Sequence, residues 1–131
     1  MRIVRVSRAE AQPLRDAQRA FFSGDVRIQA LSPDPPPEGI ELLAVFFAPG
    51  ARTRPHVHPV EQVLHAVEGE GVVAVEGKRW LMREGDVVIV PAGLWHWHGA
   101  TPTTALCHIS SKQPGQTDWD QPARDWGAYM G

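Results

Sequence analysis

The sequence contains a single cysteine, Cys107, so no disulfide bond can form within the chain. A chain without disulfides suits a reducing compartment, and we expect this protein in the cytoplasm. No stretch approaches the roughly 18 consecutive apolar residues of a membrane-spanning helix. The first residues lack the apolar segment of a secretory signal peptide. These absences predict a soluble protein with no membrane partner.

Basic residues do not outnumber acidic ones. Lys and Arg together number 13 and Asp and Glu 15, which gives a formal net charge of -2. Proteins that bind nucleic acid normally present a basic face, so we expect no nucleic-acid partner. The chain has 131 residues, of which 43% are hydrophobic and 21% are charged. This size and composition predict one globular domain that spans residues 1–131.

Glycine and proline, in contrast, are plentiful, with twelve of each. They separate short apolar runs, a pattern typical of all-β proteins. Residues 2–6 alternate polar and apolar side chains and suit a short strand, while segments 7–12 and 17–22 suit single helical turns. Further strands are expected at 26–31, 40–48, 62–71, 72–75, 78–82, 87–90 and 104–111, with Glu76 and Gly77 as a two-residue hairpin turn.

Such a succession of strands predicts a β-sandwich or barrel. Trp119, Trp126 and Tyr129 lie in a polar carboxyl-terminal tail and are expected to dock it onto the body of the domain. Trp95 and Trp97 stand on either side of His96. We expect these two on the outer face or at an interface, because exposed indole groups are costly.

One short segment carries most of the chemical information. Residues 54–62 read RPHVHPVEQ, and side chains alternate along a strand, so His56 and His58 would point to the same side. Two imidazoles on one face of a strand can converge on a divalent first-row ion. For this triplet alone, a histidine pair on a solvated strand is the alternative interpretation.

The spacing of residues around this segment is more specific than the histidine pair. A first set consists of Gly50, His56, His58, Gln62 and Gly69, and a second set of Gly85, Pro91, Gly93 and His96. Over about residues 40–111, these two motifs resemble those of a small single-domain cupin. The resemblance implies an all-β double-stranded β-helix, a jelly-roll barrel. The amino-terminal strand and carboxyl-terminal tail would pack on this barrel or on a partner.

The cupin resemblance also implies a metal site. Carried over position by position, His56, His58, residue 62 and His96 would bind one divalent ion inside the barrel. The candidate ions are Zn, Ni, Mn, Fe and Cu, and the ligand types do not decide among them. A histidine cluster that is held by hydrogen bonds without a metal is the alternative.

The fourth ligand position is a glutamate in most cupins, whereas here it falls on Gln62, next to Glu61. The distance to Gly69 and the parity with the two histidines both favour Gln62. Its amide oxygen would bind the ion directly or hydrogen-bond a water ligand. Three histidines and an amide are neutral, so the ion would keep its full charge toward anionic oxygen. The missing carboxylate also departs from the facial triad of non-haem iron oxygenases.

A narrower resemblance covers residues 51–62, 96–110 and 117–126. These segments look like the small cupins found beside, or fused to, carboxymuconolactone decarboxylase-like proteins. Many of that subgroup have glutamine at the fourth position, and their activities are largely unassigned. A sugar-acid enzyme that opens unsaturated uronates is another small cupin with three histidines and one glutamine. That likeness is an analogy of the site alone.

Other residues near the motifs are candidates for substrate binding or proton transfer. His98 is a candidate catalytic proton shuttle, or else a hydrogen-bonded histidine at the barrel mouth. Arg54 is a candidate partner for a substrate carboxylate, with a solvated surface position as the alternative. His108 is a candidate substrate contact, and its placement in the core or in the pocket stays open. Cys107 is expected to be a small buried residue and no nucleophile.

These features favour a metal-dependent enzyme of isomerase, tautomerase or lyase type. Its substrate would be a small oxygen-rich anion that carries carboxylate or carbonyl groups. A non-catalytic binding or sensing module and an oxygen-dependent dioxygenase are the alternatives. Small cupins commonly pair through outer sheet faces and exchanged terminal strands. The resemblance therefore implies a homodimer, with residues 2–6 as one candidate contact.

Overall fold

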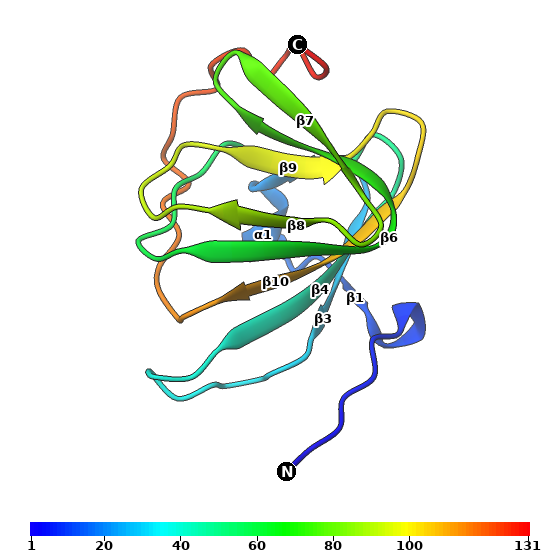
Figure 1. The fold of residues 1–131 in the computed structure, drawn as a ribbon, viewed down its shortest axis with the longest axis vertical. Helices are drawn as coiled ribbons and strands as arrows, with labels where there is room; N and C mark the ends of the chain where they lie inside the picture. The colour runs from blue at the N-terminus through cyan, green and yellow to red at the C-terminus, as the bar shows by residue number, and fades with distance from the viewer.

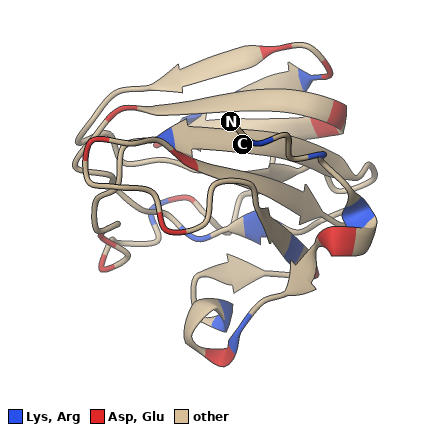
Figure 2. Ribbon diagram, turned by 90° about the horizontal axis from the view of Figure 1, so that it is seen from below, with Lys and Arg blue, Asp and Glu red and all other residues tan.

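Antiparallel β-strands are the main secondary-structure elements of the structure, a computed structural model that describes residues 1–131 (Figure 1). The strands are β1 (Gln12–Pro13), β2 (Phe22–Ser23), β3 (Val26–Ala30), β4 (Glu41–Phe47), β5 (Arg52–Thr53), β6 (Gln62–Val75), β7 (Lys78–Arg83), β8 (Val87–Val90), β9 (Trp97–Ala100) and β10 (Leu106–Lys112). They pair in the order β1-β3-β4-β10-β6-β9-β5-β2, and β7 and β8 also pair with β6. The sheet curls on itself (Figure 2), and the predicted jelly-roll barrel is confirmed. No helix is long and apolar enough to cross a bilayer.

Strand β6 is the element around which the barrel closes. Its first part pairs with β10 and β8, and its second part pairs with β7 and β9. Alternation along the strand puts Leu64 and Ala66 in the interior and leaves His65 exposed. Gly69 has a φ of 80°, and a Cβ at this position would overlap the carbonyl group of Ala105. This close approach explains why the motif has a glycine there.

The strands predicted from residue 26 onward are all present. The segments 62–71 and 72–75 form one continuous strand, β6, because its pairing passes from β10 to β9 and β7 without a break. The predicted hairpin turn is also confirmed, since β6 ends at Val75 and β7 begins at Lys78. Gly77 in that turn has a φ of 72°, a conformation that favours glycine.

The strand expected at residues 2–6 does not form. The segment pairs with no other strand, and the side chain of Ile3 is 87% exposed. A side chain holds the backbone instead. The amide nitrogen of Gln29 donates to the Arg5 carbonyl oxygen and its amide oxygen accepts from the Ser7 N–H, both at 2.9 Å. Alternation predicted a strand, but a strand also needs a neighbouring backbone to pair with.

Two helical turns form near the amino terminus, as predicted. They are the 3-10 turn η1 (Arg8–Glu10) and the helix α1 (Asp16–Arg19), and neither contains a buried residue. The second turn ends earlier than the predicted segment 17–22, because Phe22 joins β2 and pairs with β5. Both turns therefore lie on the barrel without adding to its core.

The barrel interior is divided between an apolar core and a polar cavity. Buried apolar side chains from several strands form the core, among them Val45, Phe47, Leu64, Met82 and Leu106. The polar cavity is lined by His56, His58 and Gln62 of the first motif, together with His98 and His108.

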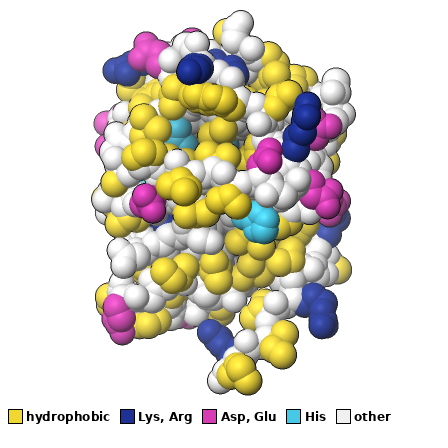
Figure 3. All heavy atoms as spheres, viewed as in Figure 1, with side chains coloured by type: hydrophobic (Ala, Val, Ile, Leu, Met, Phe, Trp, Pro, Cys, Tyr) yellow, Lys and Arg dark blue, Asp and Glu magenta, His cyan; other side chains and the backbone are white.

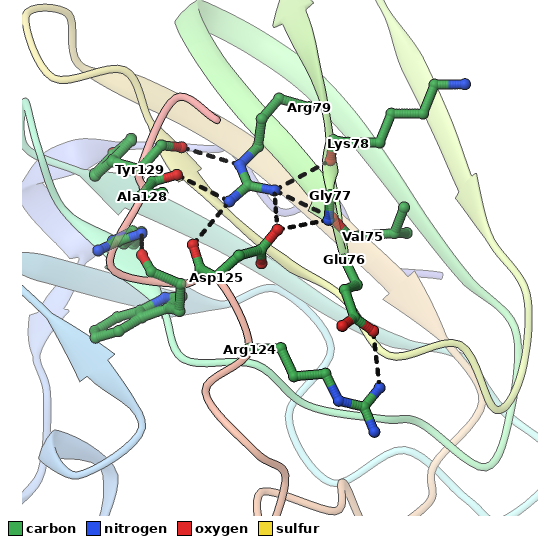
Figure 4. Close-up of polar contacts among 11 residues, drawn as sticks. Val75, Glu76, Gly77, Lys78, Arg79, Arg124, Asp125, Ala128 and Tyr129 are labelled. Carbon is green, nitrogen blue, oxygen red and sulfur yellow. Dashed lines mark hydrogen bonds and ion pairs between the residues drawn. The ribbon is translucent and has the colours of Figure 1, made fainter.

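The carboxyl-terminal tail, residues 113–131, is bound to the outside of the barrel by Arg79 (Figure 4). The side chain of Arg79 is only 7% exposed. Its guanidinium donates to the backbone carbonyl oxygens of Tyr129, Ala128 and Asp125 at 3.1, 2.9 and 3.1 Å. It also forms an ion pair with the Asp125 carboxylate at 3.4 Å. One buried arginine thus provides hydrogen-bond donors for three backbone carbonyl oxygens and one carboxylate of the tail.

A second arginine, Arg52 of β5, binds the tail through aromatic rings. It donates to the Trp126 carbonyl oxygen at 2.6 Å. Its guanidinium lies over the rings of Trp126, Tyr129 and Trp97, at 4.0, 4.2 and 4.9 Å from their centroids. Trp97 is fully buried, and the indole of Trp95 hydrogen-bonds to the tail. In this structure, the chain's own tail therefore covers the indole groups that the sequence placed on the outer face.

Replacing Arg79 with methionine should loosen the tail. Three carbonyl oxygens and the Asp125 carboxylate would lose their donor, and a hydrogen bond to a charged group contributes about 1.5–3 kcal/mol. We expect the free energy of unfolding to fall by roughly 3 kcal/mol, and residues 119–131 to lose protection in hydrogen-exchange mass spectrometry. Lys78→Met, at the exposed neighbouring position, is the control and should change neither quantity. Unaltered tail protection in Arg79→Met would contradict the role of Arg79.

Candidate metal centre

Three histidines meet inside the barrel because the two motif segments pair with each other. His56 and His58 lie between β5 and β6, and His96 directly precedes β9. The backbones of His56 and His96 form an antiparallel bridge, with N–H to carbonyl distances of 2.9 and 3.2 Å. This bridge holds their two imidazole rings 4.3 Å apart, measured between centroids.

The side chains of these three histidines converge on one point. All three are buried, with exposed fractions of 1% for His56, 5% for His58 and 1% for His96. One ring nitrogen from each lies within 4.8 Å of the others. Two nitrogens on opposite sides of an ion are about 4.2 Å apart, since each metal–nitrogen bond is about 2.1 Å long. The three histidines could therefore hold one metal ion after small side-chain rotations.

Hydrogen bonds on the far side of each ring decide which nitrogen faces this point. Nδ1 of His56 and Nδ1 of His96 donate to backbone carbonyl oxygens two residues earlier, at 2.7 and 3.0 Å. Nδ1 of His58 is hydrogen-bonded to the Thr117 hydroxyl at 3.0 Å, and its Nε2 is buried without a partner. With Nδ1 protonated in each ring, Nε2 carries the lone pair that faces the centre.

Gln62, the first residue of β6, adds an amide oxygen to the same centre. Its side chain is buried, and its amide nitrogen donates to the Ser110 hydroxyl at 2.9 Å. That bond turns Oε1 toward His96, whose Nε2 lies 3.3 Å away. Both atoms are acceptors when Nδ1 of His96 carries the proton, so a positive ion between them would satisfy both. Glu61, the other candidate for this position, is exposed.

Burial keeps the three histidines neutral. Desolvation and the nearby His96 lower the pKa of His58 to about 4, and burial also lowers the pKa values of His56 and His96. A metal ion binds only the neutral imidazole, so protons compete little for these lone pairs at pH 7. Unpartnered imidazole nitrogens and an amide oxygen fit a divalent transition ion. They do not select among Zn, Ni, Mn, Fe and Cu.

A second pair of histidines lies beside this centre, in the same cavity of about 110 Å³. Nδ1 of His98, on β9, and Nε2 of His108, on β10, are hydrogen-bonded at 2.9 Å. Desolvation lowers the pKa of His108 to about 4 and that of His98 well below its usual value. The ring of His98 lies 5.4 Å from that of His56. A neutral imidazole pair at this distance is suited to accept a proton from a bound molecule.

Two residues of the cavity wall were not foreseen as site residues from the sequence. Lys112, the last residue of β10, is buried and lines the cavity. Lys112 is four residues from His108 along β10, so the alternation of side chains along a strand could have indicated that both face the cavity. Trp119 of the tail lies over the ring of His56, with centroids 4.4 Å apart, and stacks on Phe21 at 4.6 Å. No sequence pattern indicates which ring a tail residue will cover.

Arg54 and Cys107 have surroundings that differ from those of the histidines. The guanidinium of Arg54 lies over the Trp126 ring, 4.7 Å from its centroid, and Arg54 does not line the cavity. Its contact with a substrate carboxylate stays a prediction. Cys107 is buried, and desolvation raises the pKa of its thiol to about 11. The thiol is thus protonated at neutral pH and unsuited to nucleophilic attack.

The match to a known family agrees with this arrangement. Residues 44–109 match the family described as the cupin domain. The chain is a cupin. It is 37% identical over 126 residues to the (R)-mandelonitrile lyase of Granulicella tundricola, an alignment that covers 95% of this chain and 93% of the relative. All four residues that face the candidate metal centre lie within the matched range of the cupin domain.

Solved structures support the same fold. A cupin-like protein from Thermotoga maritima superposes with a TM-score of 0.73 at 36% identity, covering 77% of this cupin and 80% of that chain. The polyketide cyclase RemF from Streptomyces resistomycificus superposes with a TM-score of 0.73 at 18% identity, covering 95% of this cupin and 89% of that chain. The second likeness concerns the fold alone.

Adding Mn²⁺, Ni²⁺ or Zn²⁺ to the metal-free cupin should raise its melting temperature. An ion that binds only the folded chain stabilises it by about 2.7 kcal/mol at a concentration of 100 times Kd. Differential scanning fluorimetry should show this shift in the unaltered protein and lose it in His96→Ala. His65→Ala, which removes an exposed histidine from β6, should keep it. Equal shifts in both variants would place the ion elsewhere in the molecule.

Proposed function

We propose that this cupin is a metal-dependent lyase that cleaves a carbon–carbon bond next to a hydroxyl group in a small molecule. His56, His58, Gln62 and His96 would hold one divalent ion. The observation that carries the proposal is that His56, His58 and Gln62 line one cavity together with a neutral histidine pair, and that the ring nitrogen of His96 meets them at the same centre. The match to (R)-mandelonitrile lyase over nearly the whole chain favours lyase chemistry over isomerase or tautomerase chemistry.

The proposed chemistry begins with removal of a proton. A divalent ion with four neutral ligands would act as a Lewis acid toward a hydroxyl or carbonyl oxygen of the substrate. His98 takes the hydroxyl proton at Nε2, while its Nδ1–H donates to Nε2 of His108 and fixes the ring. The oxygen then forms a carbonyl group, and the electron pair of the adjacent carbon–carbon bond leaves with a departing group that stabilises it, such as the cyanide of a 2-hydroxynitrile. His98 returns the proton to that group, so protons and charge balance.

The substrate that we propose is a small 2-hydroxy compound with a carboxylate, carbonyl or nitrile substituent. The cavity of about 110 Å³ admits only a small molecule. The candidate ligands are neutral, so the charge of a bound ion is not offset by them. An anionic substituent close to the ion is therefore favoured electrostatically. A cytoplasmic location, and the narrower likeness to cupins found beside carboxymuconolactone decarboxylase-like proteins, stay predictions.

The alternative functions have distinct outcomes. A non-catalytic binding or sensing cupin would be stabilised by the same 2-hydroxy compounds without forming product. A dioxygenase would consume oxygen when loaded with iron, although its usual facial triad contains a carboxylate that this site lacks. An isomerase or tautomerase would share the proton transfer at His98 and release no fragment. Product analysis and oxygen uptake therefore separate these functions from a lyase.

Replacing His98 with asparagine should remove most of the lyase activity while leaving the metal content unchanged. A positioned proton acceptor contributes about 10²–10⁴-fold to the rate. The assay is aldehyde or keto-acid release from 2-hydroxynitriles, with and without a carboxylate substituent, by metal-loaded protein. His65→Asn serves as the matched control and should keep full activity. No turnover of any of these compounds by the fully loaded, unaltered protein would contradict the proposed function.

We also propose that the protein forms a homodimer through the exposed apolar side chains of β7 and β8. Trp80, Leu81, Val87 and Ile89 on these strands are 45%, 50%, 56% and 61% exposed. Hydrophobic side chains gather on the face shown in Figure 3, over the region where Figure 1 places β7 and β8. A contiguous exposed apolar patch of this kind marks an association site.

Ile89→Glu should convert the dimer into a monomer, because a carboxylate would be buried without a partner in the apolar contact. Sedimentation equilibrium should give twice the chain mass of 14.4 kDa for the unaltered protein and the single chain mass for the variant. Met130→Glu introduces the same charge at an exposed position in the tail and should leave the dimer intact. A monomeric unaltered protein would contradict the proposed dimer.

A further inference from the structure

Lys112 occupies an unusual place for a lysine. It pairs with Gln62 across the β10–β6 ladder and with Glu41 across the β10–β4 ladder. Like His108 and Ser110, which precede it on alternate positions of β10, it lines the cavity that contains the candidate metal centre. Its side chain is only 6% exposed. Lysine is rarely buried to this extent without a strong partner.

The contacts of the Lys112 ammonium group are long. Nζ lies 3.3 Å from Oε1 of Glu41, 3.3 Å from the Gly115 carbonyl oxygen and 3.5 Å from the Gln113 carbonyl oxygen. Charge-assisted hydrogen bonds between an ammonium and a carboxylate are usually about 2.7–2.9 Å long. The Glu41 side chain is 32% exposed, so this ion pair lies where the cavity reaches solvent. A bound anion could therefore replace Glu41 as the partner of Lys112.

The charges of the cavity also favour an anionic ligand. Among its lining residues, Lys112 and Glu41 are the Lys/Glu pair, and the other polar side chains are imidazole, amide, hydroxyl and indole groups. A divalent ion at the candidate metal centre would add two positive charges that nothing in the wall offsets. A carboxylate that reached both the ion and the lysine would offset part of this charge.

We propose that Lys112 determines specificity for anionic substrates, because its ammonium group binds the substrate carboxylate while Glu41 holds that group in the empty site. The inference rests on the proposed function in one respect, since it places the substrate at the candidate metal centre. It adds the residue that distinguishes a 2-hydroxy acid from its neutral analogue.

Isothermal titration calorimetry of the zinc-loaded protein tests this proposal without any turnover. Lactate and lactamide have nearly the same size and differ in charge, so the ratio of their Kd values measures charge recognition. In the unaltered protein, lactate should bind more tightly. Lys112→Gln should weaken lactate binding on the order of 10- to 100-fold, as expected for loss of a hydrogen bond between charged groups, and should change lactamide binding little. Lys78→Gln, an exposed lysine outside the cavity, is the control.

Glu41→Gln keeps the lysine and removes its competing carboxylate. This variant should bind lactate more tightly than the unaltered protein, and it remains informative if Lys112→Gln does not fold. If Lys112 only supports the barrel, Lys112→Gln would weaken both ligands equally and Glu41→Gln would leave the Kd ratio unchanged. Either result would overturn the proposal.

The binding data and the lyase assay fail independently. A preference for lactate that depends on Lys112, without turnover of any 2-hydroxy compound, would retain this inference and reject the lyase. Turnover of neutral 2-hydroxynitriles, with equal binding of lactate and lactamide, would retain the lyase and reject the role of Lys112.

Discussion

The structure depends on one electrostatic constraint: acceptor atoms are buried together with no donor among them. The His56–His96 backbone bridge brings the two motif segments together, and Nδ1 hydrogen bonds turn the Nε2 lone pairs inward. The amide oxygen of Gln62 faces Nε2 of His96 at 3.3 Å. Burying such groups without a partner is unfavourable. A divalent ion at their centre would turn this unfavourable arrangement into a stable one, and the neutral state of the histidines leaves the lone pairs free for it.

The carboxyl-terminal tail contacts the buried histidines from outside the barrel. Thr117 of the tail is hydrogen-bonded to Nδ1 of His58, and Trp119 covers the ring of His56. The tail is held in turn by Arg79 and Arg52, which lie on the outer surface of the barrel and bind its backbone carbonyl oxygens. Groups that orient metal ligands from outside affect affinity and activity as well as shape. The tail therefore contacts two of the candidate ligands at one end and the two arginines at the other.

The motif residues were predictable from the sequence because their spacing reflects backbone geometry. Gly69 is a glycine because the backbone of Ala105 leaves no room for a Cβ. The number of residues between Gly69 and the fourth ligand position favoured Gln62 over the exposed Glu61. Residues 2–6 were predicted as a strand on alternation alone, which cannot reveal that no backbone lies beside them. Lys112 and Trp119 were missed as site residues because their places depend on long-range pairing and tail docking. Local patterns contain neither.

Anomalous diffraction from crystals grown with Mn²⁺ or Zn²⁺ tests the central claim most directly. The expected result is one peak at about 2.0–2.3 Å from Nε2 of His56, His58 and His96 and from Oε1 of Gln62. X-ray fluorescence from the same crystals identifies the element. A fully soaked crystal with no peak between these four atoms, or with its peak on other side chains, would contradict the claim that these residues form a metal centre.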